Sequence, residues 1–311
     1  MKAIFPTVAF TAALGALALA QQQPPKQQPQ QPPQGFFRGS VVSVPIYATV
    51  MDANGRLVPD LTQADFEVID NLKPSEITNF VAEVQPVAVI VALDLSGSMV
   101  NDIALAKDGA EAFMIRLLPQ DRARVVGFDD VVRFGPDFTN DRDKLINYIQ
   151  KDMQYGDGTR LWDAMYESIG ALRQEPSRKV IVVLSDGDDT TSRMSGKDDV
   201  LTAALANDVM VYTVGLRTHY RGGYNGSMIE GRPDKSLKQV SEHTGGGFFE
   251  LSRSTELNAT FSKVADEIHR QYLIAITAQS DGKPHTLGVK VKRPGMTVRA
   301  RRTYVASPPA K

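Results

Sequence analysis

Short, wholly apolar runs recur along the middle of the chain, and segments of helical period separate them. Two examples are VAVIVAL at 87–93 and VIVVL at 180–184, neither of which contains a polar residue. Strands of this kind must be covered on both faces, and helices between parallel strands provide that cover. The pattern predicts a doubly wound, mainly parallel α/β domain over residues 87–270.

Both flanks of this domain are rich in β-branched residues and turn signals. The N-terminal flank contains DFEVID, ITNFVAEV and a run at 40–50 that precedes an Asn54-Gly55 turn, which predicts a hairpin. The C-terminal flank holds further strand-like runs separated by SDGK and PG turns. We expect the two flanks to pair as one small antiparallel β-sandwich, into which the α/β domain is inserted.

The first 20 residues have the features of a secretory signal peptide: Lys2, an apolar stretch and a small-x-small ending at Ala18-Leu19-Ala20. A retained membrane anchor is the alternative, although the stretch is barely long enough and contains Pro6. We expect an exported protein, either secreted or in the periplasm or cell envelope, with no membrane span in the mature chain. The expected divisions are a signal peptide at 1–20, a Gln/Pro-rich linker at 21–38, an N-terminal β segment at 39–86, the α/β domain at 87–270 and C-terminal strands at 271–308.

Composition excludes several classes of site. The absence of cysteine rules out disulfides, thiolate metal sites and cysteine nucleophiles. The four histidines lack metal-ligand spacing, so we expect them at the surface or at helix ends. A net charge of -1 gives no general affinity for nucleic acid. Seven Lys or Arg and no acid lie within 284–311, which indicates solvated edge strands or, alternatively, a patch for acidic surface polymers.

Three loops rich in oxygen ligands are expected at the carboxyl ends of the central strands, where such sheets bind ligands. The candidate residues are Asp94, Ser96 and Ser98 in DLSGS, Thr159 and Asp163 in GDGTRLWDA, and Asp186 in LSDGDD. Hydroxyls with one or two carboxylates suit Mg²⁺, which accepts six oxygens with water among them. The adjacent Asp188 and Asp189 add negative charge, which would favour Mn²⁺ or Ca²⁺ instead. The sequence therefore predicts a divalent metal site.

The segments VALDLSGSM, GDGTRLWDAM and VVLSDGDD resemble, in this order, the three metal loops of von Willebrand factor type A (VWA) domains. The resemblance implies a VWA/Rossmann-like sheet and a metal-ion-dependent adhesion site (MIDAS) formed by Asp94, Ser96, Ser98, Thr159 and Asp186. Asp163 would be at best a supporting contact. In that family a carboxylate from a partner protein binds the metal, and binding couples to movement of the last helix, here within 254–271. The whole chain is also similar to secreted VWA-related proteins catalogued in acidobacterial genomes.

These features indicate an exported, metal-dependent protein-binding module of adhesion type, whose partner offers an Asp or Glu carboxylate. One alternative is a structural component of the envelope, in which the metal only stabilises the fold. The other is a hydrolase, because residues 186–190 spell D-x-D-x-T and resemble the acceptor loop of haloacid-dehalogenase-type phosphatases. That family places its loop after the first strand, and this sequence has no G-x-S-x-G elbow, no Walker loop and no general base beside Ser96. We therefore expect no catalytic residue, and the oligomeric state stays open.

Residues 217–232 form a connection longer than a strand-to-helix turn needs. It is either a mobile loop or a partner-contacting loop, in which Tyr220 and Tyr224 would be anchors.

Overall fold

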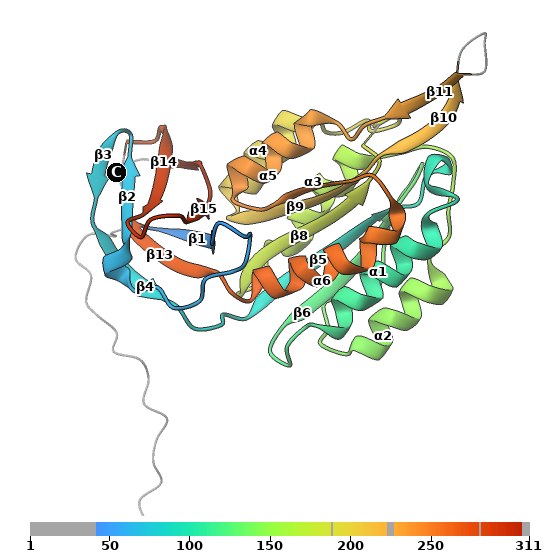
Figure 1. Ribbon diagram of the computed structural model, residues 1–311. Helices are drawn as coiled ribbons and strands as arrows, with labels where there is room; N and C mark the ends of the chain where they lie inside the picture. Colours follow the sequence, from blue (N-terminus) through green and yellow to red (C-terminus); the bar gives the residue numbers. More distant parts are fainter. Residues whose placement is uncertain (1–41, 188, 223–226, 280, 307–311) are drawn as a thin grey trace, which may run out of the picture. The chain divides into compact units, whose positions relative to one another are not determined.

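The computed structural model describes residues 42–306 except 188, 223–226 and 280 (Figure 1). For residues 218–222 and 227–230 it describes the backbone alone. The predicted signal peptide at 1–20, the predicted linker at 21–38 and residues 39–41 of the predicted β segment therefore lie outside the described residues. None of the helices in the described part of the chain is long and apolar enough to cross a membrane.

A six-stranded sheet forms the centre of the α/β domain, in the order β12–β9–β8–β5–β6–β7. All neighbours are parallel except β7, which returns antiparallel to β6. The strands are β5 Val87–Asp94, β6 Arg122–Phe128, β7 Val132–Phe134, β8 Arg178–Ser185, β9 Val209–Leu216 and β12 Phe248–Leu251. Every residue of β5 and β9 is buried, which explains why these strands contain almost no polar side chains.

Helices cover both faces of this sheet (Figure 1). One layer consists of α1 Ile103–Ile115, α2 Arg142–Asn147 and α6 Leu257–Ile268, and the other of α3 Leu161–Leu172, α4 Lys197–Ala206 and α5 Lys235–Thr244. Short helical turns are η1 Gln63–Asp65, η2 Gly97–Met99, the π-helical η3 Tyr148–Asp152 and η4 Ser254–Glu256. The helices α1 and α6 pack closely, because a Cβ on Gly109 would lie 2.8 Å from the ring of Phe261.

The flanking strands form two four-stranded antiparallel sheets that share an apolar core. Their orders are β15–β1–β13–β4 and β16–β14–β2–β3. The strands are β1 Ser43–Met51, β2 Phe66–Asp70, β3 Lys73–Ser75, β4 Ile77–Val81, β13 Tyr272–Thr277, β14 Pro284–Val291, β15 Thr297–Arg299 and β16 Thr303–Val305. Strands from the two ends pair with each other, β1 with β13 and β2 with β14. The predicted fold class is thus confirmed.

One local expectation was wrong. The Asn54-Gly55 turn closes only a single bridge between Met51 and Leu57, because β1 pairs instead with β13 and β15. Within residues 217–232, the long connection noted in the sequence, β10 Thr218–Gly222 and β11 Ser227–Gly231 pair as an antiparallel hairpin. The hairpin follows the carboxyl end of β9 and projects at the upper right of Figure 1.

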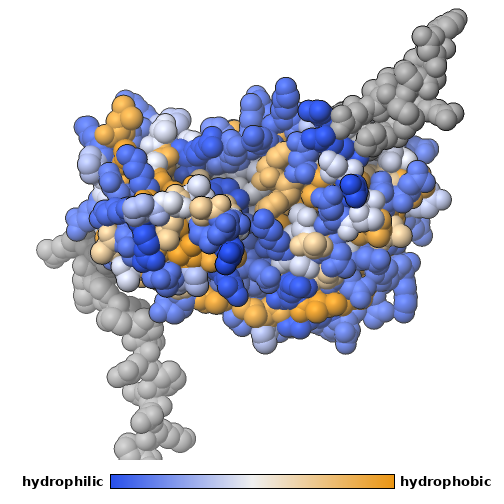
Figure 2. Space-filling model, viewed as in Figure 1, coloured by the Kyte–Doolittle hydropathy of each residue, from blue (hydrophilic) through white to orange (hydrophobic). Residues whose placement is uncertain are grey.

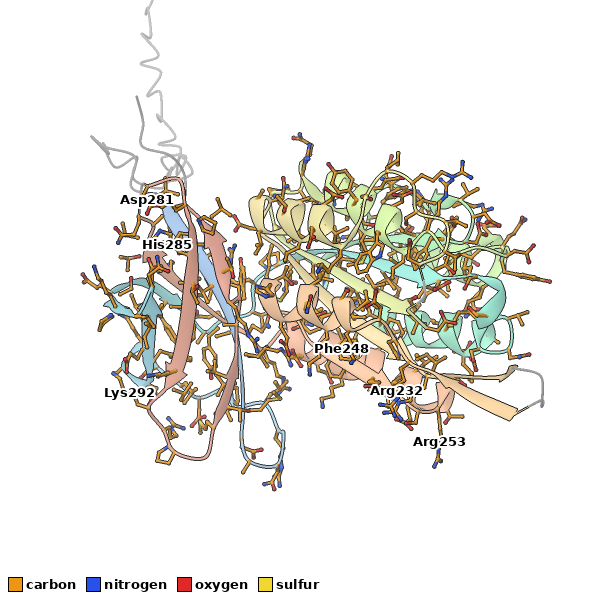
Figure 3. All side chains as sticks on the ribbon, turned by 90° about the horizontal axis from the view of Figure 1, so that it is seen from above. Arg232, Phe248, Arg253, Asp281, His285 and Lys292 are labelled. Atoms are coloured by element: carbon orange, nitrogen blue, oxygen red, sulfur yellow. The ribbon has the colours of Figure 1, made fainter. Side chains whose placement is uncertain are left out.

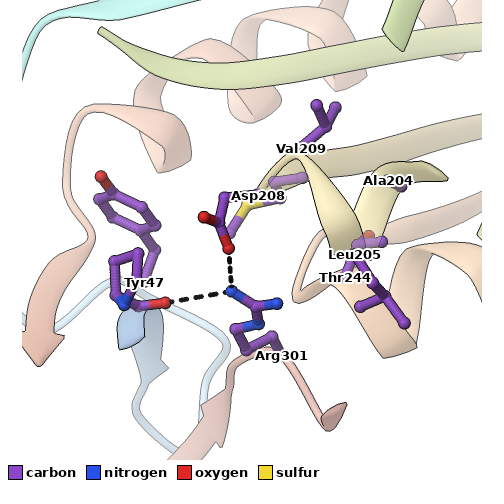
Figure 4. A pocket seen from close by; sticks show the side chains of 9 residues that line it. Tyr47, Ala204, Leu205, Asp208, Val209, Thr244 and Arg301 are labelled. Carbon is purple, nitrogen blue, oxygen red and sulfur yellow. Dashed lines mark hydrogen bonds and ion pairs between the residues drawn. The ribbon is translucent and has the colours of Figure 1, made fainter. Parts of the chain in front are cut away.

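Charged side chains connect the C-terminal strands to the α/β domain. Arg301 donates to Asp208 Oδ1 over 2.6 Å and to the carbonyl of Pro45 over 3.4 Å, beside a small pocket (Figure 4). Arg302 pairs with Glu242 of α5 over 3.0 Å, and Arg299 pairs with the buried Glu267 of α6. These three of the seven basic residues at 284–311 are therefore paired with acids of the same chain.

His285 is a second departure from expectation, because it is 3% exposed inside the sandwich rather than at the surface. Its Nδ1 lies 2.7 Å from Asp70 Oδ1 and its Nε2 lies 3.2 Å from Asp281 Oδ1 (Figure 3). Burial opposes a charge on the ring, but the hydrogen bonds to these carboxylates raise the pKa of His285 above its usual value. Burial and a hydrogen bond to Asp70 likewise raise the pKa of Tyr304 to about 12.

The molecular surface is largely hydrophilic on the face shown in Figure 2, and apolar residues appear there in patches. Such a surface is ordinary for a folded protein unless the patches gather at one place.

Two glycines of the α/β domain give a matched test of the packing. A Cβ on Gly246, just after α5, would lie 1.9 Å from the carbonyl oxygen of Val211 in β9, whereas one on Gly170 in α3 would meet nothing within 4 Å. We expect Gly246→Ala to lower the free energy of unfolding by about 3 kcal/mol. Gly170→Ala should raise it by about 0.5–1 kcal/mol, because alanine restricts the unfolded chain and favours helix.

Urea unfolding of both variants measures this difference as a shift of the midpoint at constant slope. Equal stability of the two variants would contradict the close approach of residue 246 to β9.

Candidate metal centre

Asp94 is the last residue of β5, and its carboxylate is fully buried at the carboxyl edge of the sheet. Its Oδ1 accepts a hydrogen bond from the backbone N–H of Ser96 over 3.0 Å. Its Oδ2 accepts one from the hydroxyl of Ser185, the last residue of β8, over 2.6 Å. Two adjacent parallel strands therefore fix the orientation of this carboxylate.

The hydroxyls of the two serines in the first loop lie close to each other. Ser96 is buried and stands at the N-cap of the short η2 turn. Its Oγ lies 3.0 Å from the Oγ of Ser98, and Ser98 is exposed to solvent. The loop thus brings two hydroxyls side by side at the rim of the sheet, next to the buried Asp94.

Backbone hydrogen bonds tie the second loop to the first. The N–H of Gly156 donates to the carbonyl of Leu95 over 3.1 Å, and the N–H of Gly97 donates to the carbonyl of Asp157 over 3.3 Å. Thr159, which is buried, bonds instead to the third loop: its N–H donates to Thr190 Oγ1 over 3.0 Å. Thr159 therefore joins the second loop to the third.

The third loop brings Asp186 to the same place. Asp186 is nearly buried, and Gly187 beside it has φ +99°, a left-handed conformation that favours glycine. A Cβ on Gly187 would lie 2.4 Å from the backbone N of Asp234, so no larger side chain fits between this loop and the start of α5.

Electrostatics show that Asp94 and Asp186 interact with each other. Burial raises the pKa of Asp94 to about 7, and the negative charge of Asp186 adds to this rise, while hydrogen bonds from Ser185 and Ser96 oppose it. Buried carboxylates that raise each other's pKa in this way are stabilised either by a proton or by a cation. The buried pair and its hydroxyl neighbours therefore fit a hard divalent cation.

Asp163 supports the loops rather than the centre itself. Its side chain accepts hydrogen bonds from the N–H groups of Arg193, Met194 and Ser195, over 2.9, 3.0 and 3.0 Å, and from the Ser195 hydroxyl over 2.9 Å. Burial opposes ionisation, yet these donors together hold the pKa of Asp163 below its usual value. The carboxylate therefore fastens the segment that follows the third loop.

Two further acids near the centre are also bound to the protein. Asp189 Oδ1 accepts from the Ser192 hydroxyl over 2.6 Å, and Asp129 Oδ2 accepts from Arg133 over 2.5 Å. Asp188 is not among the described residues. Across the described parts of 42–306, no three Asp, Glu or His side chains gather as a metal-binding group. Any cation here would thus depend on the hydroxyls as well as on the two carboxylates.

Sequence reasoning missed Ser185 and Asp129 as parts of this region. Ser185 directly precedes Asp186, and Asp129 directly follows β6, so both stand at carboxyl ends of central strands. That position alone is the signal that would have found them.

Comparison of the sequence with known proteins gives a match to one family model. The family model of the von Willebrand factor type A domain matches residues 88–263. A search of curated proteins found no match.

Solved structures share the fold at low sequence identity. A von Willebrand factor type A protein from Catenulispora acidiphila is 12% identical, covers 87% of this chain and 76% of its own, and has a TM-score of 0.50. Proximal thread matrix protein 1 from the mussel byssus, with a zinc-occupied MIDAS motif, is 15% identical, covers 63% of this chain and 50% of its own, and has a TM-score of 0.51.

A third structure is the domain of the type V pili tip protein Mfa5 from Porphyromonas gingivalis, which is 14% identical, covers 60% of this chain and 95% of its own, and has a TM-score of 0.49. The structural likenesses concern the fold alone, whereas the family model extends over more than half of the chain. The chain belongs to the von Willebrand factor type A domain family.

Proposed function

We propose that this protein is an exported, metal-dependent protein-binding module. The residues that would hold the divalent cation are Asp94, Ser96, Ser98, Thr159 and Asp186. The observation that carries the proposal is the buried Asp94, which interacts with Asp186 beside two hydroxyls 3.0 Å apart. Mg²⁺ is the proposed cation, with Mn²⁺ and Ca²⁺ as alternatives.

Each residue has a separate part in binding. A bound cation supplies a coordination position that an Asp or Glu carboxylate of a partner protein can fill. Ser185 holds one oxygen of Asp94 and the N–H of Ser96 holds the other, so the carboxylate cannot rotate away. Ser98 is exposed, which puts the open side of the centre toward solvent, where a partner can approach.

Binding is favoured over catalysis on two grounds. VWA domains are mostly interaction modules, often dependent on a metal. The sequence also contains no G-x-S-x-G elbow and no Walker loop. Export is supported by the first 20 residues, which have the features of a secretory signal peptide.

Substitution of the buried ligand tests the metal centre. Asp94→Ala should lower the affinity for Mg²⁺ roughly 100-fold or more, because it removes one of only two carboxylates. Titration calorimetry measures the affinity. Asp137→Ala is the matched control, since Asp137 is exposed, pairs with Arg124 over 3.3 Å and should leave the affinity unchanged.

Pull-down with the tagged full chain from envelope and culture-medium extracts then tests protein binding. Partner capture should need Mg²⁺ and should be lost with chelator or with Asp94→Ala. Capture that is indifferent to both would argue against a metal bridge. A variant that loses stability but still captures the partner would favour the structural-component alternative.

The pKa of Asp94 gives a pH prediction for the metal-free chain. Folded Asp94 keeps its proton up to a pKa of about 7, whereas unfolded Asp94 loses its proton near the ordinary value of 3.8. The free energy of unfolding should therefore fall as pH rises from about 4 to about 7, by at most about 4 kcal/mol. Added Mg²⁺ should offset this loss at the upper end of the range, because the cation binds the ionised carboxylate.

Urea unfolding at several pH values measures the slope. Asp94→Asn removes the titrating group, so the difference between the two chains isolates Asp94 from other groups such as His285. Identical pH dependence of the two chains would show that Asp94 titrates normally.

A further inference from the structure

Four large apolar side chains are exposed on the loops that surround the candidate metal centre. Val100 is 49% exposed, Val131 48%, Tyr155 66% and Met194 67%. Other exposed large apolar side chains of the described residues are dispersed over the sandwich, a connecting segment and two helices: Leu72, Val84, Ile115, Tyr166 and Val305. The edge that bears the centre is thus richer in exposed apolar groups than other parts of this surface.

Val100 and Tyr155 are fixed to the first loop. Val100 follows Ser98 by two residues, and its N–H donates to the carbonyl of Gly97 over 3.4 Å. Tyr155 precedes Gly156, whose N–H donates to the carbonyl of Leu95, the residue after Asp94. Both side chains therefore stand next to the loop that contains Asp94, Ser96 and Ser98.

Val131 and Met194 are fixed through buried carboxylates. The N–H of Val131 donates to Asp129 Oδ1 over 2.8 Å, and the carbonyl of Asp129 accepts from Arg160, which follows Thr159. The N–H of Met194 donates to Oδ1 of Asp163 over 3.0 Å, and Asp163 lies one helical turn after Thr159. Hydrogen bonds thus hold both backbones beside the second loop while the side chains stay in water.

Single exposed apolar residues need no explanation, but a group of them around one site marks a contact surface. Tyr and Met are enriched in interfaces, because they bury large area at low entropic cost or adapt their shape. The same edge carries the exposed carboxylates of Asp130 and Asp157. These two negative charges would repel a partner segment that carries several acidic residues. They would therefore favour a segment with a single acidic residue, whose carboxylate binds the metal.

We propose that Val100, Val131, Tyr155 and Met194 form an apolar rim that selects the partner. The rim fits a protein segment in which a single Asp or Glu stands between large apolar residues. The inference rests on the proposed function, because the acidic residue needs the metal. The metal would supply the anchor, and the rim would supply specificity by desolvating the flanking side chains.

Short random peptides displayed on phage are the probe for this proposal. The full chain is immobilised with Mg²⁺, and bound phage are released with chelator. Four chains are compared: the natural one, Asp94→Ala, the rim variant Val100→Ser/Val131→Ser/Tyr155→Ser/Met194→Ser, and the matched control Ile115→Ser/Tyr166→Ser. The control removes exposed apolar groups away from the centre. Unfolding midpoints and Mg²⁺ titration establish that each serine variant is folded and retains the metal.

The natural chain and the control should enrich peptides with one acid flanked by large apolar residues. The rim variant should lose the flank preference and bind the enriched peptides roughly tenfold or more weakly. Enrichment of acidic peptides with polar flanks, or equal affinity for the rim variant, would overturn the rim and leave the metal-dependent function standing. Absence of any enrichment that depends on Mg²⁺ and Asp94 would overturn both the apolar rim and the proposed metal-dependent function.

Discussion

The exclusion of water from strand β5 determines the geometry and the electrostatics of the candidate metal centre. β5 lies between two layers of helices and is buried over its whole length, including Asp94 at its end. A carboxylate in that position cannot be hydrated as it would be in water, so its charge must be balanced by hydrogen bonds, by a proton or by a cation. The short hydrogen bond from Ser185 and the raised pKa of Asp94 are both results of this one constraint.

The three loops act as one unit because polar groups join them. Backbone bonds connect the first loop to the second, Thr159 bonds to Thr190 of the third, and Asp163 fastens the segment beyond it. Few of these contacts involve the proposed ligands themselves. The arrangement of Asp94, Ser96, Ser98, Thr159 and Asp186 therefore depends on neighbours that would never touch a metal.

Features that depend on local pattern could be predicted from the sequence. Wholly apolar strands and amphipathic helices predict the central sheet, and the carboxyl ends of those strands predict where the loops converge. Contacts between distant residues could not be predicted. Such contacts depend on which surfaces meet in the folded chain. Examples are the hydrogen bond from Ser185 to Asp94, the donors that bind Asp163, and the acids that pair with Arg299, Arg301 and Arg302. The hairpin within 217–232 was not predicted, because the glycines of this segment are typical of loops. The backbone pairing of β10 with β11 nevertheless forms two strands there.

The insertion of the α/β domain between the two halves of the sandwich has a mechanical consequence. The chain enters the domain at Val87, the first residue of β5, and leaves it after α6, whose Ile268 carbonyl accepts from Arg178 at the start of β8 over 2.9 Å. Entry and exit thus share the edge of the sheet opposite to the metal loops. Tension applied at those loops would run along the strands and divide between two covalent connections. It would end in the β1–β13 and β2–β14 ladders, where many hydrogen bonds share the load.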